Sequence, residues 1–378
     1  MRDHLVLCIN GARHTVRGRD AFLSLSDFLR LRLGLIGTKI VCSEGDCGAC
    51  TVLVGRPTKR KAESGKLNEA DASPNAYAFR IQHSVFSISY LPVDSCIQFL
   101  FQLDCTHVVT VEGLRPDGQL NSVQQAMIDC HGSQCGFCTP GFVMAMTGLR
   151  EELDELDAEC LRTGLTGNLC RCTGYTPIIE SGLQCNGAEH ERLNDLYPPM
   201  PMVADFERLR AEPITLNAEW FGEPHIAACP TTLAGALDFL AEHPTATIVA
   251  GATDIGVRVN KSGRIPPALL DLNRIPDLDD VRLENNTLIA GARASWTSLL
   301  TACGLALPEF TSILSTFGAP QIRHVGTLGG NIANASPIAD SLPFLYVMEA
   351  TLTLARSASA GRSTREVNIN DFYLGYKK

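Results

Sequence analysis

Hydrophobic and polar positions alternate near the N-terminus in two short runs, "HLVLCI" at 4–9 and "ARHTV" at 12–16. Alternation of this kind indicates β-strands, because successive side chains of a strand point to opposite faces. Asn10 and Gly11 separate the two runs, and an Asn-Gly pair in this position is typical of a tight hairpin turn. The chain is therefore predicted to begin with a β-hairpin.

The pattern changes to a helical period in "SLSDFLRLRLGL" at 24–35, where the apolar residues recur on one face. Ser24 or Ser26 can cap the start of this helix, and Gly34 can end it. A hairpin followed by a helix and then by a loop rich in cysteine predicts a small α+β domain, which we place at residues 1–111.

A polar segment interrupts this first domain. Residues 56–76 are rich in Lys, Glu, Ser and Ala, which predicts an exposed loop. The run that follows, "AYAFRIQHSVFSISYL" at 76–91, returns to strand-like sequence. The segment is therefore interpreted as a solvated insertion.

The pattern is helical again over 121–184. Thr139-Pro140 and Thr176-Pro177 each read as an N-cap followed by proline at the first helical position. A helical domain is therefore predicted over 112–188. Residues 189–216, which contain "YPPMPM", are predicted to be a linker.

The remaining part of the chain, 217–378, mixes strand and helix patterns. Thr231 or Thr232 can cap a helix in "LAGALDFLAEH". "TATIVAGATDIGV" reads as a buried strand that runs into a glycine-containing turn, and "TLIAGARASW" repeats that theme. "GTLGGNIANASP" at 326–337 reads as a loop rich in Gly, Asn and Ser. This part is predicted to be an α/β or α+β domain.

The length of 378 residues is consistent with two or three domains. The formal net charge of −9 argues against binding to a nucleic acid backbone as the main activity. No stretch approaches the roughly 20 apolar residues of a membrane span, and the N-terminus has no long apolar core of the kind found in signal peptides. We therefore expect a cytoplasmic protein that binds neither nucleic acid nor membrane.

The fifteen cysteines occur in tight groups, which points to a specific chemistry. The expected compartment and the odd count both argue against a framework of disulfides. Short spacings suit metal ligation, because neighbouring thiolates must converge on one centre. The cysteines outside the groups are expected to be reduced and mostly buried thiols; they are Cys8, Cys105, Cys130, Cys160, Cys185, Cys229 and Cys303.

The first group has the C-x4-C-x2-C spacing of a plant-type [2Fe–2S] site and consists of Cys42, Cys47 and Cys50. Its loop must wrap three thiolates around a cluster, and Gly45 and Gly48 allow this because glycine reaches positive φ without penalty. A fourth thiolate must come from further along the chain, and the spacing leaves Cys96 and Cys105 as candidates. A zinc site is the alternative interpretation.

The second group consists of Cys135, Cys138, Cys170 and Cys172. Its two pairs precede two predicted helix starts and can close a cage of four thiolates. A helix N-terminus favours negative charge and lowers the pKa of a thiol, which suits a cluster with net negative charge. Zinc is again the alternative.

Several motifs together carry a resemblance to a known family; they are "VCSEGDCGACTV", "TVEGL", "GSQCGFCTPG", "GNLCRCTGY", "IVAGATDIGV" and "QIRHVGTLGGNIANASPIADSLP". With these motifs the chain resembles the molybdenum hydroxylases, the group of xanthine dehydrogenase and aldehyde oxidase. Iron–sulfur and FAD parts in one chain without the molybdenum part resemble the small subunit of the bacterial xanthine dehydrogenases.

The resemblance implies an α+β multidomain fold. A ferredoxin-like β-grasp [2Fe–2S] domain is expected at 1–111 and a helical-bundle [2Fe–2S] domain at 112–188. An α+β FAD-binding domain of the vanillyl-alcohol-oxidase (PCMH) type is expected at 217–378. The family continues with a third flavin subdomain that covers the FAD and helps to receive NAD. Because the sequence stops at "NINDFYLGYKK", we expect a C-terminally truncated flavin domain.

The resemblance also implies site residues. It selects Cys96 as the fourth ligand of the first cluster, and it places the second cluster nearer the molybdenum centre, with Gln134 close to that cofactor. The FAD-binding residues that it implies are Val249, Ala250, Gly251, Ala252, Thr253, Asp254 and Ile255 in a first loop, and Thr327, Gly329, Gly330, Asn331, Ser336 and Asp340 in a second.

These loops have a plausible physical role in holding a dinucleotide. The first strand is not followed by G-x-G-x-x-G, so a Rossmann site is not expected. Backbone N–H groups in glycine-rich turns can still form a concavity that binds a diphosphate. Asn331, Ser336 and Asp340 could then hydrogen-bond ribityl or ribose hydroxyls.

The function that the resemblance implies is electron transfer within a xanthine dehydrogenase. A separate large subunit with a molybdenum cofactor would oxidise hypoxanthine and xanthine, and the electrons would pass through two [2Fe–2S] clusters to FAD and then to NAD. A heterotetramer of two small and two large subunits is expected, and this chain itself would hold no catalytic acid–base pair. The alternatives are the small subunit of an aldehyde- or N-heterocycle-oxidising relative, or a binding module stabilised by zinc.

Overall fold

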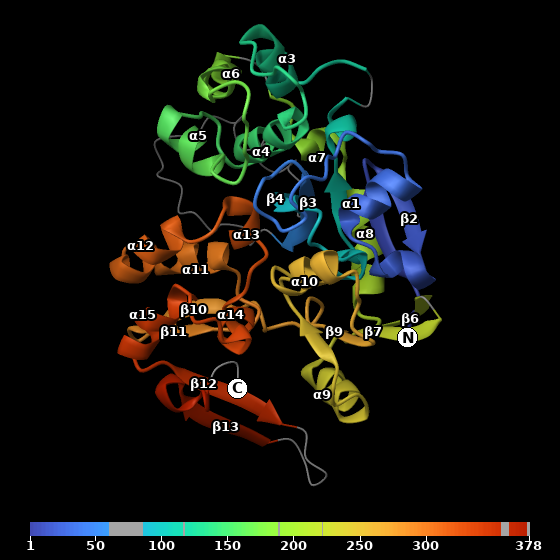
Figure 1. Ribbon diagram of the computed structural model, residues 1–378, viewed down its shortest axis with the longest axis vertical. Coiled ribbons are helices and arrows are strands. Elements are labelled where there is room, and N and C mark those ends of the chain that lie inside the picture. Colours follow the sequence, from blue (N-terminus) through green and yellow to red (C-terminus); the bar gives the residue numbers. More distant parts are fainter. Residues whose placement is uncertain (60–85, 116–117, 188–189, 221, 357–362, 376–378) are drawn as a thin grey trace, which may run out of the picture.

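The computed structural model describes residues 1–59, 86–115, 118–187, 190–220, 222–356 and 363–375 (Figure 1). These residues form a mixed α and β structure with separate sheets and a group of helices, so the predicted fold class is confirmed. Among the described residues, no helix combines the length and the apolar character needed to cross a membrane.

The first sheet contains five strands: β1 (Leu5–Ile9), β2 (Ala12–Val16), β3 (Thr51–Lys59), β4 (Phe86–Asp94) and β5 (His107–Val109). Their order is β2-β1-β5-β3-β4, with β1 and β5 parallel and the other neighbours antiparallel. The predicted hairpin is confirmed, since Leu5 pairs with Val16 and both turn residues have positive φ, 49° at Asn10 and 80° at Gly11.

One helical segment packs against this sheet. Helix α1 (Leu25–Asp27) continues as a π-helical turn, Phe28–Arg32, and Ser24 Oγ accepts a hydrogen bond from the backbone N–H of Asp27. The predicted helix is thus confirmed with Ser24, rather than Ser26, as its cap. Short 3-10 turns complete this part of the chain; they are Gly18–Phe22, Leu100–Leu103 and Val111–Leu114.

The predicted polar loop is shorter than expected at its N-terminal end. Residues 56–59 are part of β3, where Arg56 pairs with Ser89 of β4. The strand continues into the polar segment because its backbone pairs with β4, and this pairing does not require apolar side chains. The rest of that prediction, 60–76, lies outside the described residues.

The next part of the described chain is helical, as predicted. Its helices are α3 (Ser122–Asp129), α4 (Thr139–Glu152), α5 (Ala158–Gly164) and α6 (Thr176–Gln184). Thr139 and Thr176 are the first helical residues and not the N-caps. Cys138 and Tyr175 hold the cap positions, and Tyr175 has a φ of 70°. Proline therefore lies one position further into each helix than predicted, still within the first turn where its missing N–H costs nothing.

The predicted linker contains helices. They are α7 (Leu193–Leu196) and α8 (Pro199–Arg210), preceded by a 3-10 turn at Cys185–Gly187. Pro199 opens α8, and α8 packs against β4 with Phe206 fully buried. Proline here starts a helix because the first helical position needs no backbone donor.

The C-terminal part begins with a four-stranded sheet: β6 (Ile214–Trp220), β7 (Glu223–Cys229), β8 (Thr247–Val249) and β9 (Ala268–Asp271), in the order β6-β7-β9-β8. Helix α9 (Leu233–Glu242) starts at Thr232 as predicted, with Thr232 Oγ1 accepting from Gly235 N–H at 3.1 Å. In the edge strand β8, Val249 is buried while Ile248 is half exposed, because successive side chains of a strand point to opposite faces.

The last part consists of short elements. They are α10 (Ile255–Ser262), β10 (Val281–Glu284), β11 (Thr287–Ala290), α11 (Trp296–Cys303), α12 (Pro308–Thr316), α13 (Pro320–Arg323), α14 (Leu328–Asn334), α15 (Ser341–Val347), β12 (Thr351–Arg356), β13 (Ser363–Asn368) and a 3-10 turn at Ile369–Asp371. The loop predicted at 326–337 is wrong over most of its length, because α14 occupies it. Thr327 caps that helix by accepting from Gly330 N–H at 3.2 Å.

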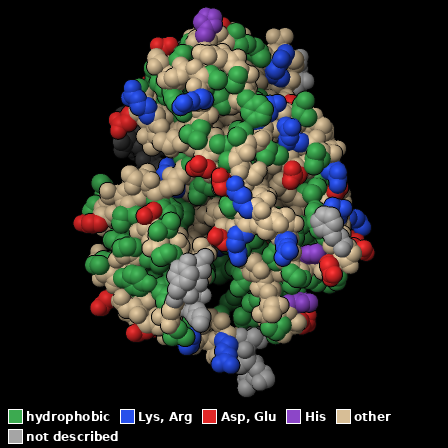
Figure 2. Space-filling view, in the orientation of Figure 1, with side chains coloured by type: hydrophobic (Ala, Val, Ile, Leu, Met, Phe, Trp, Pro, Cys, Tyr) green, Lys and Arg blue, Asp and Glu red, His purple; other side chains and the backbone are tan. Residues whose placement is uncertain are grey.

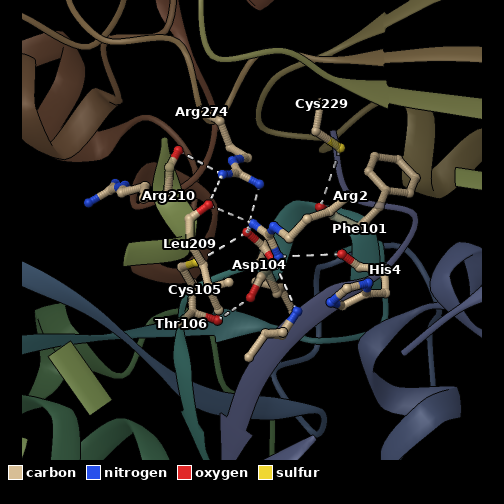
Figure 3. Close-up of polar contacts among 12 residues, drawn as sticks. Arg2, His4, Phe101, Asp104, Cys105, Thr106, Leu209, Arg210, Cys229 and Arg274 are labelled. Carbon is tan, nitrogen blue, oxygen red and sulfur yellow. Dashed lines mark hydrogen bonds and ion pairs between the residues drawn. The ribbon is translucent and has the colours of Figure 1, made fainter. Parts of the chain in front are cut away.

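A buried ionic network joins these parts. Arg2 and Arg274 both bind the carboxylate of Asp104, with N–O distances of 2.8 and 2.7 Å (Figure 3). Both guanidinium groups also donate to the carbonyl oxygen of Leu209 in α8, at 2.9 and 3.1 Å. The network therefore ties the N-terminus, the first sheet, α8 and the C-terminal part into one structure.

Candidate metal and flavin sites

The loop of the first cysteine group runs from the end of the π-helical turn to β3. Gly45 and Gly48 have φ of 75° and 64°, in the region that favours glycine. A Cβ at Gly48 would overlap the carbonyl of Gly167, so this loop and the loop of the second group are in close contact. The glycines therefore allow the tight wrap that the spacing predicts.

The four sulfurs of the first set meet in pairs. Cys47 is a neighbour of Cys42 and contributes to lowering its pKa, and Cys96 is a neighbour of Cys50 and raises the pKa of Cys50. Cys50 and Cys96 are buried, with Ile97 beside them. The structure thus brings Cys96, from the segment after β4, to the three cysteines of the loop.

Cys105 lies elsewhere. Its thiol donates to Asp104 Oδ2 at 3.1 Å, and it packs with Cys8, Phe206 and Leu209. Of the two candidates that the spacing leaves open, only Cys96 lies in this group.

The second set also forms two pairs. Cys172 Sγ lies 3.6 Å from Cys135 Sγ, and Cys170 is a neighbour of Cys138 and raises the pKa of Cys138. Cys135 and Cys172 are exposed, whereas Cys170 is buried. One side of this set is therefore open to a partner.

The two cysteine loops touch through hydrogen bonds. Leu169 N–H, next to Cys170, donates to Cys47 O at 3.0 Å, and Asn168 Nδ2 donates to Gly48 O at the same distance. Gln321 from α13 supports this contact by donating to Asn168 Oδ1 at 2.8 Å. The sites that each loop would form are therefore neighbours.

Burial and nearby N–H groups affect the pKa values of the thiols more than their position at a helix N-terminus does. Burial raises the pKa of Cys42, but N–H groups of its own loop outweigh this and lower it below the usual range. The Phe137 N–H lowers the pKa of Cys135. Burial, together with the neighbouring Cys170, raises the pKa of Cys138 to about 12, contrary to the lowering expected for a thiol at a helix start.

The paired arrangement fits a two-iron cluster. Among the described residues, no three His, Cys, Asp or Glu side chains converge closely enough to hold a single ion. A zinc site gathers its ligands around one point, whereas a [2Fe–2S] cluster takes four thiolates, two on each iron. Two pairs of thiols in each set match the second requirement.

The first candidate flavin loop, 249–255, lies between β8 and α10. A Cβ at Gly251 would overlap the carbonyl of Val325, so the loop packs directly on the segment before α14. Gln98 and Gln102, from the segment after Cys96, donate to the carbonyls of Gly251 and Ala250 at 3.0 and 2.7 Å. The loop is therefore held from two sides.

The second candidate loop is the start of α14 and the turn after it. Asn334 Nδ2 lies 3.5 Å from Asp254 Oδ1, which links the two loops. Asn331 accepts from Ser341 at 2.6 Å, while Gly330 and Asp340 are exposed. The two loops thus lie together, with glycine backbone and polar side chains open to a ligand, which fits a dinucleotide with a diphosphate.

Sequence patterns did not identify every residue at these sites. Gln98, Gln102, Asn260 and Lys261 contact the candidate loops. Only tertiary packing brings them there, and no motif or spacing in the chain marks them.

Family models match three parts of the chain. The "2Fe-2S iron-sulfur cluster binding domain" matches residues 8–76 and the "[2Fe-2S] binding domain" matches residues 110–182. The "FAD binding domain in molybdopterin dehydrogenase" matches residues 222–378. Two iron–sulfur domains and one flavin domain therefore correspond to the predicted cofactors, two [2Fe–2S] clusters and FAD.

Curated relatives match nearly the whole chain. The xanthine dehydrogenase of Drosophila subobscura is 31% identical over 99% of this chain and 30% of its own length. The aldehyde oxidase 2 of Macaca fascicularis is 30% identical over 98% of this chain and 29% of its own length. The chain therefore spans about 30% of the length of these relatives.

A solved structure aligns with part of the chain. Quinoline 2-oxidoreductase from Pseudomonas putida 86 is 30% identical and aligns with 49% of this chain and 94% of its own, at a TM-score of 0.37. The order of the three family models, together with the relatives that match along the whole chain, establishes the family. The chain belongs to the molybdenum hydroxylase family of oxidoreductases, of which it carries the two [2Fe–2S] domains and the FAD-binding domain.

Proposed function

We propose that this chain is the electron-transfer subunit of a xanthine dehydrogenase. The observation that carries the proposal is the unbroken contact between the three candidate sites: Leu169 N–H donates to Cys47 O, and Gln98 donates to the first flavin loop at Gly251 O. When bound, the clusters and FAD would supply one- and two-electron redox steps between a molybdenum centre on a large partner subunit and NAD. The chain itself would hold these groups in the order in which electrons pass through them.

The ligand sets follow from the paired thiols. In the first set, Cys42 and Cys47 would hold one iron, and Cys50 and Cys96 the other. In the second set, the same roles fall to the pair Cys135 and Cys172 and to the pair Cys138 and Cys170. The FAD would lie over the two loops, with the Gly329 and Gly330 backbone near its diphosphate and Asn331, Ser336 and Asp340 near its hydroxyls.

The open side of the second set supports a direction of electron flow. Cys135 and Cys172 are exposed, and Gln134 beside them is exposed too. Phe137 and Leu169 on the same loops are about half exposed, 49% and 50%. A large molybdenum-containing subunit seated here would deliver electrons to the second set first, and two such pairs would make the heterotetramer.

The first test is the cofactor content of the protein purified without oxygen. We expect about four iron and four sulfide per chain, the sum for two [2Fe–2S] clusters, together with flavin. Iron with sulfide but no flavin would remove the flavin step from the proposal. Zinc with no visible absorption would contradict the electron-transfer role.

Two cysteine variants test the ligand assignment. Cys96→Ser should lose one cluster, so that iron falls by half, because Cys96 contributes to the first set only. Cys105→Ser is the matched control and should keep both clusters, since Cys105 packs with Asp104 and Phe206. Loss of a cluster in the control but not in Cys96→Ser would reverse the assignment.

An aldehyde-oxidising enzyme is the second candidate, because aldehyde oxidase 2 matches at 30% identity, close to the 31% of a xanthine dehydrogenase. The partner subunit decides between them. The complex purified with its partner should reduce its clusters with hypoxanthine or xanthine, and reduction by aldehydes alone would favour the second candidate.

A further inference from the structure

Helix α10 begins at the first flavin loop, and its last turn contacts the first cysteine loop (Figure 1). Its N-cap residue, Asp254, belongs to the first flavin loop, and its last turn carries Asn260 and Lys261. An eight-residue helix is about 12 Å long. One rigid element therefore has a candidate flavin site at its start and a candidate cluster site at its end.

Asn260 joins the two chain segments that supply the thiols of the first set. Its Nδ2 donates to Ser43 O and to Cys96 O, both at 2.9 Å. Ser43 follows Cys42 in the loop, whereas Cys96 arrives from beyond β4. An amide nitrogen has two N–H donors, and here each binds a different side of the ligand set.

The body of α10 is fitted to the same place. A Cβ at Gly256 would overlap the carbonyl of Ile97, so the helix backbone lies directly on the segment after Cys96. Val257 packs against the buried group of Cys50, Cys96 and Ile97. The packing of α10 therefore fixes the position of Asn260 next to the thiol segments.

Lys261 brings a positive charge to the same loop. Its Nζ lies 3.0 Å from Glu44 Oε2 and 3.4 Å from Cys42 O. Residues 42–50 themselves carry Glu44 and Asp46 and no basic side chain. In the space-filling view, basic side chains lie over α10 with acidic side chains next to them (Figure 2).

We propose that the last turn of α10 is part of the first cluster's site. Asn260 is a positioning residue that holds the Cys42–Cys50 loop and Cys96 together, and Lys261 raises the reduction potential of the cluster. A nearby positive charge stabilises the electron that a cluster gains on reduction, and local charge is one of the factors that set such potentials. This inference rests on the proposed function, since it requires the cluster to be there.

Lys261→Met tests the charge, with Lys261→Arg as the matched control. The full chain is titrated electrochemically while electron paramagnetic resonance follows each cluster, and Cys96→Ser identifies the signal of the first. At a fixed potential near the midpoint, the ratio of reduced to oxidised first cluster should fall about two- to fivefold in Lys261→Met, as for loss of a partly exposed charge contact. The second cluster should not shift, and Lys261→Arg should match the parent chain.

Asn260→Leu tests the positioning role. The first cluster should be lost to a chelator several-fold faster than in the parent chain, while the second is lost at the parent rate. Asn273→Leu is the control, because the Asn273 amide nitrogen donates to Ala250 O of the flavin loop and to Asp271 Oδ1.

The outcomes separate the two proposals. A chain that holds both clusters, with an unshifted first potential in Lys261→Met and parent-like cluster loss in Asn260→Leu, overturns the role of α10 and leaves the electron-transfer function intact. Equal shifts of both clusters also overturn it, because they show a general effect. A chain without iron overturns both proposals.

Discussion

His107 lies in β5 of the first sheet with both ring nitrogens engaged. Nε2 accepts from Gly11 N–H at 3.1 Å, so Nδ1 carries the hydrogen and donates to the Tyr90 hydroxyl at 2.7 Å. The side chain is fully buried, and burial lowers the pKa of His107 to about 4 from 6.5. The neutral ring is therefore built into the hairpin turn that the sequence predicts.

This histidine makes the fold sensitive to acid. Because its folded pKa lies below its unfolded value, its contribution is fully present above pH 6.5 and is lost as the pH falls toward 4. At pH 5 the loss is about 2 kcal/mol of unfolding free energy, from a difference of 1.5 pH units at about 1.4 kcal/mol each. His107→Gln should lose less stability than the parent between pH 7.5 and pH 5, measured by urea unfolding. An equal loss in both proteins would contradict this origin.

Residue patterns mark the cysteines of the two sets but not the residues that surround them. The thiols of each loop lie within a few residues of one another. Their spacing in the sequence is therefore enough to predict that the loop folds around a bound group. Spacing left both Cys96 and Cys105 open, and the resemblance selected Cys96. In the fold the two cysteines lie in separate buried groups. Asn260 could not be predicted, because its two acceptors are more than 160 residues away.

At the scale of elements, local signals gave correct predictions where they acted alone. The hairpin at Asn10-Gly11, the helix after Ser24 and the helix after Thr232 all start or turn where their residues indicate. Each depends on contacts within a few residues, such as a side chain that accepts from the N–H three positions on.

Two of the wrong predictions at this scale share one cause. Helix α14 has low intrinsic propensity because of its glycines and asparagines, and it forms because Thr327 caps it and Ile332 is buried. The segment 189–216 looks like a linker because of its prolines, but α8 buries Phe206 and Leu209. Tertiary burial outweighs propensity in both, and the sequence pattern does not show what each helix packs against.

The close contact at Gly251 leads to a prediction for the flavin site. Gly251→Ala places a Cβ against the carbonyl of Val325 and should push the two flavin loops apart. We expect flavin content to fall while iron content stays at the parent level. Gly235→Ala is the control, because its Cβ would meet ordinary contacts at 3.4 Å and beyond, and Ala suits a helix better than Gly. Unchanged flavin binding in Gly251→Ala would show that FAD does not depend on this contact.

At the scale of the whole molecule, Asp104 links the N-terminal and C-terminal parts of the chain through Arg2 and Arg274. Its carboxylate is 1% exposed and pairs with two guanidinium groups that are 4% and 5% exposed. Removing one member of a buried ion pair leaves an uncompensated charge, which costs about 3–5 kcal/mol. The arrangement joins residues at positions 2, 104 and 274, so no local pattern could predict it.

Asp104→Asn should therefore lower the free energy of unfolding by about 3–5 kcal/mol, measured by urea denaturation monitored by circular dichroism. The control is Asp205→Asn, whose carboxylate pairs with Arg13 and Arg208 at the surface. An exposed pair of this kind contributes about 0–1 kcal/mol. Similar losses in the two variants would mean that the network adds nothing beyond an ordinary surface pair.

The Arg2–Asp104–Arg274 network also bears on the order in which the protein is made. Synthesis runs from the N-terminus, so Arg2 and Asp104 are made long before Arg274. Until Arg274 is made, the Asp104 carboxylate lacks one of its two cations. Likewise, the carbonyl oxygen of Leu209 cannot accept its second hydrogen bond until Arg274 has been made. The N-terminal half of the chain therefore reaches its final stability only after the flavin domain has been synthesised and has closed onto it.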